Sequence, residues 1–484
     1  MTFESPWRNM LRGFFVAVII RSINIQGDIH MDYRTERDSM GEILVPSKAY
    51  WGAQTQRSLE NFTQSAETMP MPIIKALAIV KKASAIANFK AGRLDSKRKE
   101  IITTVCDEIL SGKLDSHFPL TVWQTGSGTQ TNMNVNEVIA NRGNELAGEK
   151  LLHPNDHVNM SQSSNDTFPS AMNISAVAEI TGHLFPALEE GINVLRRLMD
   201  ENMNVIKTGR THLQDAVPIT FGQEISAWLE MISQGKESIA QAMTTLYPLA
   251  LGGTAVGTGL NAPEGFAEES AQEIATLTGH PFTTSPNKFH ALTSKASFAY
   301  VHGTLKGLSA DMMKIANDIR WLSSGPRCGL GEIFIPENEP GSSIMPGKVN
   351  PTQCEALTMA AVQVMGNDSA IGFAASQGNF QLNVFMPVIA YNFLQSVNLI
   401  AETFTFFTRK CLEGIRPNTQ KMSENLSKSL MLVTALNPHT GYDKAALIAK
   451  NAHEKNITLK ESAVSLGILT AEEYDRYIKP QDMV

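Results

Sequence analysis

The chain has 484 residues, of which 43% are hydrophobic and 18% are charged, and its formal net charge is −7 at pH 7. This length allows a large core and suggests more than one domain. The negative charge and the lack of a dense Lys/Arg block argue against a nucleic-acid partner. A small anionic ligand stays possible, because local sites and not net charge hold ligands.

Residues 1–30 differ from the rest of the chain. The apolar run of residues 14–20 is flanked by arginines and resembles the core of a signal peptide or a transit sequence. It is too short to span a membrane, and no convincing cleavage site follows it. From Met31 the sequence is typical of an ordinary cytosolic N-terminus. We therefore expect residues 1–30 to be a disordered tail or an over-extended start, and we expect no membrane partner.

The cysteines are scattered singly, without disulfide-like or metal-like spacing. They are Cys106, Cys328, Cys354 and Cys411. Isolated cysteines are typical of free thiols in a reducing compartment, so a cytoplasmic location is predicted. Cys354 lies in a polar stretch described below, but no His-plus-base partner is evident for it, and we interpret it as a packing residue.

Helical periodicity takes over after a turn-rich opening that ends near Leu59, where short strands or hairpins are expected. Apolar residues recur at helical spacing in residues 73–91 and 97–111 and then over longer segments. Residues 296–322 contain no proline, and their Leu, Met and Ile residues recur every three or four positions, close to the coiled-coil repeat. Similar stripes occur in residues 169–204, 221–246, 351–366 and 382–412, and the segment from Thr220 to Gln223 is expected to form a capping box at the start of one of them.

Helices of about thirty residues would each be roughly 45 Å long, and only a bundle of stacked helices can bury them. A long flank would stay exposed, so oligomerisation is expected. Shorter helices follow from about Arg416. The sequence thus predicts a mainly α fold with an N-terminal domain (31–162), a central helical bundle (163–415) and a small C-terminal helical domain (416–484).

Two polar clusters precede predicted helices in the first part of the chain. Residues 124–132 are hydroxyls and amides around two glycines, which suits an anion cradle at a helix N-terminus. They lack the Gly-Lys-Ser/Thr ending of nucleotide-binding loops. Residues 161–166 open a long helical segment, and taken alone they are better explained as an N-cap cluster.

Two histidine-containing segments carry residue types that suit metal binding or catalysis. Residues 153–157 hold metal-like ligand types, but Pro154 makes the segment a turn and not a helix face, so no metal is predicted. Residues 209–215 place His212 among Arg, Thr, Gln and Asp. Such neighbours can fix the tautomer of an imidazole and tune its charge near neutral pH, which favours a functional role.

The densest polar segment is residues 341–355, where two serines, Lys348 and Asn350 lie between Gly and Pro residues. Asn350 is expected to cap the next helix, with Pro351 at its first position and Gln353 closing a capping box. Unpaired N–H groups at that helix start, beside Lys348, would make a site for a carboxylate or a phosphate.

Four anion-friendly loops at helix starts are hard to explain as four independent caps. Together, residues 341–355, residues 209–215 and the loops around Ser127 and Ser163 resemble the fumarase/aspartase superfamily and, within it, class II fumarase. The resemblance runs from about Asp38 to the C-terminus. His212 and the ending at residues 352–355 favour fumarase, because aspartate ammonia-lyases typically carry Gln in place of this His. Argininosuccinate and adenylosuccinate lyases differ in the flanks of the Ser-Ser-x-Met-Pro core.

The resemblance implies reversible hydration of fumarate to L-malate in the tricarboxylic acid cycle, without a cofactor. Aspartate ammonia-lyase activity is one alternative, and an inactive structural scaffold is a second. The resemblance also implies a homotetramer whose bundles form a multi-helix core and whose active sites combine three subunits. Ser342 would be the catalytic base and His212 would relay the other proton through water, supported by Glu355. Which of the two residues has which proton-transfer role is left open.

The remaining site residues are carried over from the same resemblance. The implied substrate-binding residues are Ser127, Gly128, Thr129, Ser163, Ser164, Asn165, Thr211, Ser343, Lys348, Val349 and Asn350. A second dicarboxylate site would comprise His153, Pro154, Asn155 and Asp156. Some relatives carry Arg where this chain has Lys150, which makes the second site a weaker inference.

Overall fold

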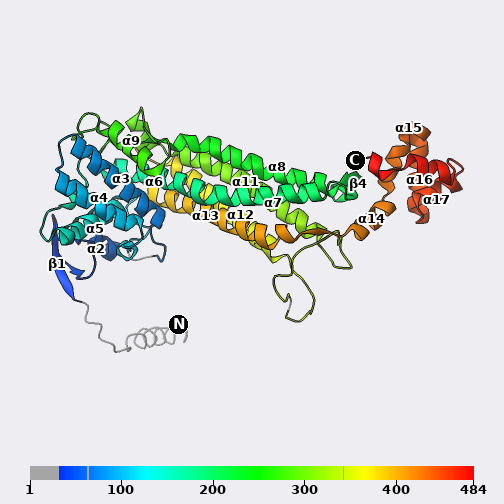
Figure 1. The fold of residues 1–484 in the computed structure, drawn as a ribbon, viewed down its shortest axis with the longest axis horizontal. Coiled ribbons are helices and arrows are strands. Elements are labelled where there is room, and N and C mark those ends of the chain that lie inside the picture. Colours follow the sequence, from blue (N-terminus) through cyan, green and yellow to red (C-terminus); the bar gives the residue numbers. More distant parts are fainter. Residues whose placement is uncertain (1–31, 63–64, 342) are drawn as a thin grey trace, which may run out of the picture.

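The computed structural model describes residues 32–62, 65–341 and 343–484 (Figure 1). The molecule is elongated, with a group of helices at one end, a bundle of long helices in the middle and a small helical group at the other end. The prediction of a mainly α fold is confirmed. The expectations for residues 1–30 and for Ser342 fall outside the described residues.

The N-terminal part begins with an antiparallel hairpin of β1 (Tyr33–Asp38) and β2 (Gly41–Pro46), as expected for the turn-rich opening. Its helical elements are α2 (Ala53–Asn61), α3 (Met71–Lys90), α4 (Ser96–Leu110), a 3-10 turn (Asp115–His117), α5 (Thr129–Ala147) and a π-helical turn (Pro154–Val158). α3 is apolar on most of its surface because it packs against several helices at once, α4 among them.

Five segments form the long bundle, and Figure 1 shows them side by side. They are α6 (Ser164–Glu179), which continues through a π-helical turn (Ile180–Leu184) into α7 (Phe185–Glu201), and then α8 (Phe221–Met243), α11 (Ala296–Leu322), α12 (Thr352–Ser376) and α13 (Met386–Lys410). The predicted seam of α11 is buried, including Leu305, Leu308 and Met312. α12 runs ten residues beyond the predicted end at Gly366, because packing against α11 and α13 outweighs the roughly 1 kcal/mol cost of a helical glycine.

The connections between long helices alternate between the two ends of the bundle. The end next to the N-terminal part carries a 3-10 turn (Thr244–Leu246), β5 (Pro248–Leu249) paired with β6 (Thr283–Thr284), α9 (Phe266–Thr278) and α10 (Lys288–Thr293). The far end carries the hairpin of β3 (Ile206–Thr211) and β4 (Gln214–Thr220), and β7 (Ile333–Phe334) paired with β8 (Arg416–Pro417). Polar loops are thus concentrated at both ends.

The C-terminal helices have their own hydrophobic cluster, built around residues such as Leu436, Ile448 and Ala463. After the 3-10 turn Leu412–Gly414, the elements are α14 (Thr419–Lys428), a 3-10 helix (Leu430–Leu436), α15 (Asn437–Thr440), α16 (Tyr442–Lys455), α17 (Leu459–Ser465), α18 (Ala471–Tyr477) and a 3-10 turn (Pro480–Asp482). In the described part of the chain, every helix is too short or too polar to cross a membrane.

The two predicted capping boxes had different outcomes. At α8, Thr220 Oγ1 accepts from the Gln223 N–H at 3.0 Å and Gln223 Oε1 accepts from the Thr220 N–H at 2.9 Å, so that box is confirmed. At α12 the prediction is wrong, since the helix begins at Thr352 after Pro351 without a side-chain cap. Asn350 Oδ1 instead accepts a 2.9 Å hydrogen bond from Lys348 Nζ, so its side chain is not available to the helix.

Candidate active site

The Ser127 loop leads into α5 and packs directly on α6. Gly128 has φ +72°, and a Cβ at this position would lie 2.3 Å from the ring of Phe168, so glycine permits both the turn and the close approach. Ser127 is nearly buried, and its Oγ lies 2.8 Å from Thr129 Oγ1. The predicted hydroxyl cluster therefore lies at a helix N-terminus, where unpaired N–H groups favour an anion.

The Ser163 loop opens α6 through a capping box, which agrees with the interpretation of this segment alone as an N-cap cluster. Ser163 Oγ accepts from the Asn165 N–H at 3.2 Å, and the Ser163 N–H donates to Asp166 Oδ1 at 2.9 Å. The other oxygen of Asp166 accepts from the N–H groups of Gly252 and Thr254. Burial raises the pKa of Asp166 to about 6, although these hydrogen bonds act in the opposite direction.

These two loops converge within one chain. Asn132, from the first turn of α5, donates through Nδ2 to Ser164 Oγ at 2.9 Å. The Asn165 amide donates to the Ala255 carbonyl at 2.8 Å, which holds the loop from the other side. The polar loops at residues 124–132 and 161–166 are thus joined by a hydrogen bond at the N-terminal end of the bundle.

His212 lies at the tip of the β3–β4 hairpin, at the far end of the bundle. Thr211 pairs with Gln214, which leaves His212 and Leu213 as a two-residue turn with φ of 57° and 60°. Positive φ at both positions is the requirement of a type I′ turn, for which Asn and Gly are preferred. Non-glycine residues in this region cost on the order of 1 kcal/mol or more, and such strain is concentrated at functional sites.

A buried charge cluster holds the base of this hairpin. Arg210 donates to both carboxylate oxygens of Glu332, at 2.6 and 3.0 Å, and Lys207 Nζ lies 3.4 Å from the same carboxylate and 3.1 Å from Glu224. Asn425 of α14 adds a hydrogen bond of 2.9 Å to Glu332. Burial alone would raise the pKa of Glu332, but the Arg210 hydrogen bond and the Lys207 charge outweigh it and hold that pKa below its usual range.

The stretch that carries Lys348 is exposed and lies at the same far end as the hairpin. Lys348, Val349, Asn350 and Glu355 line a cavity of about 710 Å³. Asn317, Arg320 and Trp321 from the last turns of α11 line it too. Ser343 is exposed beside the undescribed Ser342. Cys354 is fully buried, with Sγ 4.0 Å from Cys411 Sγ, in accord with its interpretation as a packing residue.

One chain does not bring the four clusters together. The Ser127 and Ser163 loops lie at the N-terminal end of the bundle, whereas the hairpin of His212 and the Lys348 loop lie at the opposite end (Figure 1). α8 alone spans most of this separation, and its 23 residues correspond to about 35 Å. Within the described residues, His212 has no hydrogen bond to Glu355, its predicted supporting residue.

The segment predicted to form a second dicarboxylate site folds as a π-helical turn. The Asp156 N–H donates to His153 Nδ1 at 3.2 Å, and the His153 N–H donates to His157 Nδ1 at 2.9 Å. Asn155 and Asp156 line a cavity of about 590 Å³ whose wall also includes Ser163 and Arg93. Across residues 32–62, 65–341 and 343–484, no group of three or more His, Cys, Asp or Glu side chains is arranged to hold a metal ion.

The structure places further residues at these sites beyond those that the sequence predicts. Lys81 is fully buried and donates to Asn159 Oδ1 at 2.8 Å and to Gln162 Oε1 at 2.9 Å, behind the Ser163 loop. A lysine within the apolar face of residues 73–91 was the available signal, because such a residue is fully buried only when it has partners. Arg93 and Arg320 carry no comparable signal in the sequence.

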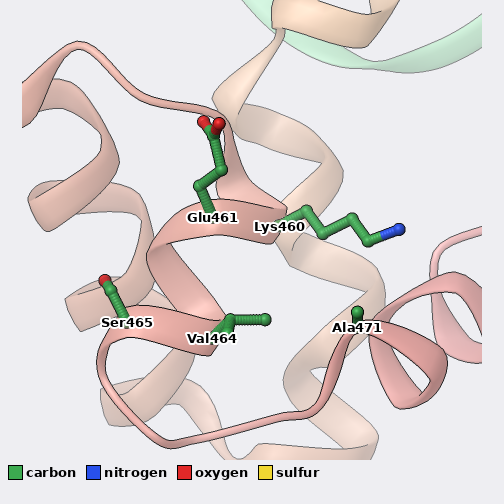
Figure 2. Close-up of a pocket in the computed structure, with 5 residues that line it drawn as sticks. All are labelled: Lys460, Glu461, Val464, Ser465 and Ala471. Atoms are coloured by element: carbon green, nitrogen blue, oxygen red, sulfur yellow. The ribbon is translucent and has the colours of Figure 1, made fainter.

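A separate depression of about 380 Å³ lies on the C-terminal helices α17 and α18 (Figure 2). Its two charged side chains already have partners. Lys460 pairs with Asp475 at 2.6 Å, and Glu461 closes the capping box of α17 with Thr458. The remaining lining residues are Val464, Ser465 and Ala471. The depression therefore contributes nothing to the candidate active site.

Comparison with known proteins supplies the family. A family model described as "Lyase" matches residues 41–366, and one described as "Fumarase C C-terminus" matches residues 432–484. The chain is 60% identical over 458 residues to the class II fumarate hydratase of Bacillus subtilis and 59% identical over 459 residues to that of Campylobacter jejuni. Each alignment covers 94% of this chain and 99% of the relative.

The fold agrees with this match. The crystal structure of recombinant class II fumarase from Schistosoma mansoni superposes with a TM-score of 0.91 at 45% identity. The superposition covers 93% of this chain and 99% of that one. Identity of this level over nearly whole chains leaves the long-helix bundle and both flanking parts in common, and the chain therefore belongs to the class II fumarate hydratase family.

Proposed function

We propose that this protein catalyses the reversible addition of water to fumarate, giving L-malate. The observation that carries the proposal is the near full-length match, at up to 60% identity, to relatives named class II fumarate hydratase. The Ser163, His212 and Lys348 loops lie at helix starts or turns and are exposed or line cavities, and the Ser127 loop lies at the start of α5. The two alternatives, an aspartate ammonia-lyase and an inactive structural scaffold, have no comparable support.

The chemical problem defines what the site must supply. Dehydration of malate removes a weakly acidic C–H proton next to a carboxylate and protonates the departing hydroxyl group. The negative charge that develops on that carboxylate makes aimed donors the main requirement. Lys348 and Asn350, which are already hydrogen-bonded to each other at 2.9 Å, are suited to hold one carboxylate as a pair.

The proton-transfer roles fall to Ser342 and His212. Ser342 takes the carbon-bound proton, and His212 delivers the other through a water molecule. The proposal for Ser342 rests on the sequence, since this residue lies outside the described part of the chain. His212 is supported by its place at the tip of a strained hairpin anchored by the Arg210–Glu332 pair.

The remaining site residues supply hydrogen bonds to the substrate carboxylates. The hydroxyl and amide groups of the Ser127 and Ser163 loops line one end of the bundle, and Thr211 and Ser343 belong to the other end. Their separation within one chain supports active sites that are completed by other copies. We therefore propose a homotetramer in which the far end of one bundle meets the N-terminal end of another.

The surface of the bundle supports such an assembly. Along α12, Met359, Val362 and Phe373 are each more than 60% exposed. Tyr300 of α11 and Phe406 of α13 are each more than half exposed. Large apolar side chains exposed on long bundle helices mark a surface that a second copy can cover. The four free cysteines support a cytoplasmic location.

The turn at residues 153–156 is proposed as a second dicarboxylate site. Arg93 supplies a cation in the wall of its cavity, whereas Lys150 is exposed and is not among the lining residues. Calorimetry with succinate should find two classes of site in the native protein and one in Arg93→Gln. An unchanged second class in this variant would remove Arg93 from the site.

The function is tested by offering malate, aspartate and argininosuccinate separately and recording the absorbance of fumarate. Fumarate is expected from malate alone, and fumarate from aspartate but not malate would overturn the proposal. Ser342→Ala should abolish turnover. Ser465→Ala, an exposed serine on the distant helix α17, is the matched control and should leave turnover unchanged.

A further inference from the structure

We propose that Lys81 and Asn132 are positioning residues that set the direction of the Ser164 hydroxyl, so that its hydrogen points to the substrate carboxylate. This inference rests on the proposed function of the Ser163 loop as a substrate-binding element. It adds a buried relay of hydrogen bonds that begins at Lys81 in α3 and ends at the active-site surface.

The relay begins at the Lys81 amino group, which donates to two side-chain oxygens. Lys81 is 0% exposed, and Nζ donates to Asn159 Oδ1 at 2.8 Å and to Gln162 Oε1 at 2.9 Å. A lysine side chain donates hydrogen bonds in this setting, so each amide must turn its oxygen toward Nζ. The amide nitrogen of Gln162 in turn donates to the carbonyls of Val158 and Met160.

The second step fixes the orientation of Asn132. Asn159 Oδ1 accepts not only from Lys81 but also from the amide nitrogens of Asn132 and Asn136, each at 3.2 Å. Asn159 Oδ1 can only accept hydrogen bonds, so Asn132 must turn its NH₂ group, and not its oxygen, toward it. The Asn132 oxygen consequently points away and lies 3.2 Å from Thr167 Oγ1.

The third step reaches the substrate-binding surface. The same NH₂ group of Asn132 donates to Ser164 Oγ at 2.9 Å. A hydroxyl that accepts one hydrogen bond from a fixed donor still has its own hydrogen to give. Since Ser164 is the first residue of α6, its hydroxyl lies at a helix start, where the helix dipole favours an anion. The hydroxyl therefore reinforces an anion site, whereas the reverse polarity would present lone pairs to the anion.

The test is a double-mutant cycle on substrate affinity. Lys81→Met removes the donor but keeps an unbranched buried side chain. The variant should weaken the hydrogen bond from the Ser164 hydroxyl to the substrate carboxylate. A hydrogen bond to a charged group is worth about tenfold or more in affinity, so KM for fumarate should rise about tenfold in Lys81→Met. This hydrogen bond to the substrate is present in the ground state and in the transition state, so kcat should change by less than about threefold.

Combining Lys81→Met with a second substitution distinguishes positioning of Ser164 from a general loss of structure. In Ser164→Ala the hydroxyl is absent, and adding Lys81→Met should raise KM by less than about twofold. In Ser163→Ala, the matched background whose hydroxyl is outside the relay, the rise of about tenfold should persist. An equal effect of Lys81→Met in both backgrounds, or none in the native background, would overturn the proposal.

Two further measurements test the proposal if a variant does not fold or if the proposed activity is absent. If Lys81→Met does not fold, Asn132→Ala interrupts the relay one step later and should show the same dependence on Ser164. If the native protein does not interconvert fumarate and malate, the proposed function fails separately, and the same cycle is run on the calorimetric affinity for succinate. A native protein that binds no succinate would overturn the relay as well.

Discussion

Arg210 and Glu332 form a bidentate ion pair, with N–O distances of 2.6 and 3.0 Å, between the hairpin that carries His212 and the segment that leads to Lys348. Glu332 is fully buried. Asn425 donates to the Glu332 carboxylate and the Asn418 N–H donates to the Glu332 backbone carbonyl, so both connect this segment to the C-terminal helices. One carboxylate thus connects three parts of the far end of the bundle, two of which carry candidate active-site residues.

Removing this carboxylate should be costly. Glu332→Gln leaves Arg210 and Lys207 without their shared counter-charge, and breaking one partner of a buried pair costs about 3–5 kcal/mol. We expect a loss of stability of about this size in chemical denaturation, together with reduced kcat. Asp475→Asn, which breaks the exposed pair with Lys460, is the control and should cost less than about 1 kcal/mol. Equal losses in both variants would show that the Glu332 cluster has no special role.

His212→Asn separates chemistry from folding at the hairpin tip. Asn tolerates positive φ better than His, so the turn at φ 57° should form at least as well as in the native protein. General acid–base catalysis contributes about 10²–10⁴-fold, so kcat should fall by at least about 100-fold. The control is His183→Asn, an exposed histidine that pairs with Glu179. Full activity of His212→Asn would remove His212 from the mechanism.

The long helices could be predicted because their burial repeats along the sequence. The bounds Ala296–Leu322 agree with the sequence pattern, because the apolar repeat runs through this segment without a proline or a glycine-rich break. The end of α12 and the missing cap at Asn350 could not be predicted, because packing against other helices sets the first and the Lys348 side chain occupies Asn350 in the second. The domain limits at residues 162 and 415 stay predictions.

The candidate site was predictable only in part, for a similar reason. Polar clusters such as Ser163–Asn165 and His212 are unusual along the sequence itself. Lys81 is unusual only through its partners Asn159 and Gln162, which lie 78 and 81 residues away. No local pattern reports contacts of that separation. The distance between the two ends of the bundle is likewise a property of the folded chain.

Stability should depend on pH through the buried Lys81 and Asp166. Burial lowers the pKa of Lys81 from 10.5 to about 7, partly offset by Asp166, whose own pKa is raised by burial to about 6. Above about pH 7 folded Lys81 loses a proton that the unfolded chain keeps until 10.5, so stability should rise with pH across this range. Cys106, which also faces Lys81, stays neutral there because burial raises its pKa to about 12.

The direction reverses for Asp166. Between pH 3.8 and about 6 the folded protein holds a proton on Asp166 that the unfolded chain has lost, so this contribution to stability falls as pH rises. The measurement is the difference in unfolding free energy between native protein and Lys81→Met from pH 6 to 9. The native protein should gain stability relative to the variant as pH rises above about 7. A flat difference would contradict the buried, shifted Lys81.

The exposed apolar stripe of α12 should be required for assembly. Val362 is 61% exposed, so Val362→Glu should leave the fold of the single chain intact, as judged by circular dichroism. Placed against another copy, the buried carboxylate would have no partner, and light scattering should show dissociation with loss of activity. Val464→Glu on α17, also exposed, is the control. Full-size active assemblies of Val362→Glu would place the interface elsewhere.

Active sites shared between copies predict that two variants impaired at opposite ends of the bundle restore each other. Ser164→Ala damages the N-terminal end of the bundle and His212→Asn damages the far end, which lie about 35 Å apart along α8. If each site takes one end from one copy and the other end from another copy, mixed assemblies contain some sites with both ends intact. Co-expression of the two variants should therefore recover a measurable fraction of native activity, whereas a mixture of Ser164→Ala and Thr129→Ala, which damage the same end, should not. Activity no higher than that of either variant alone would mean that each copy completes its own site.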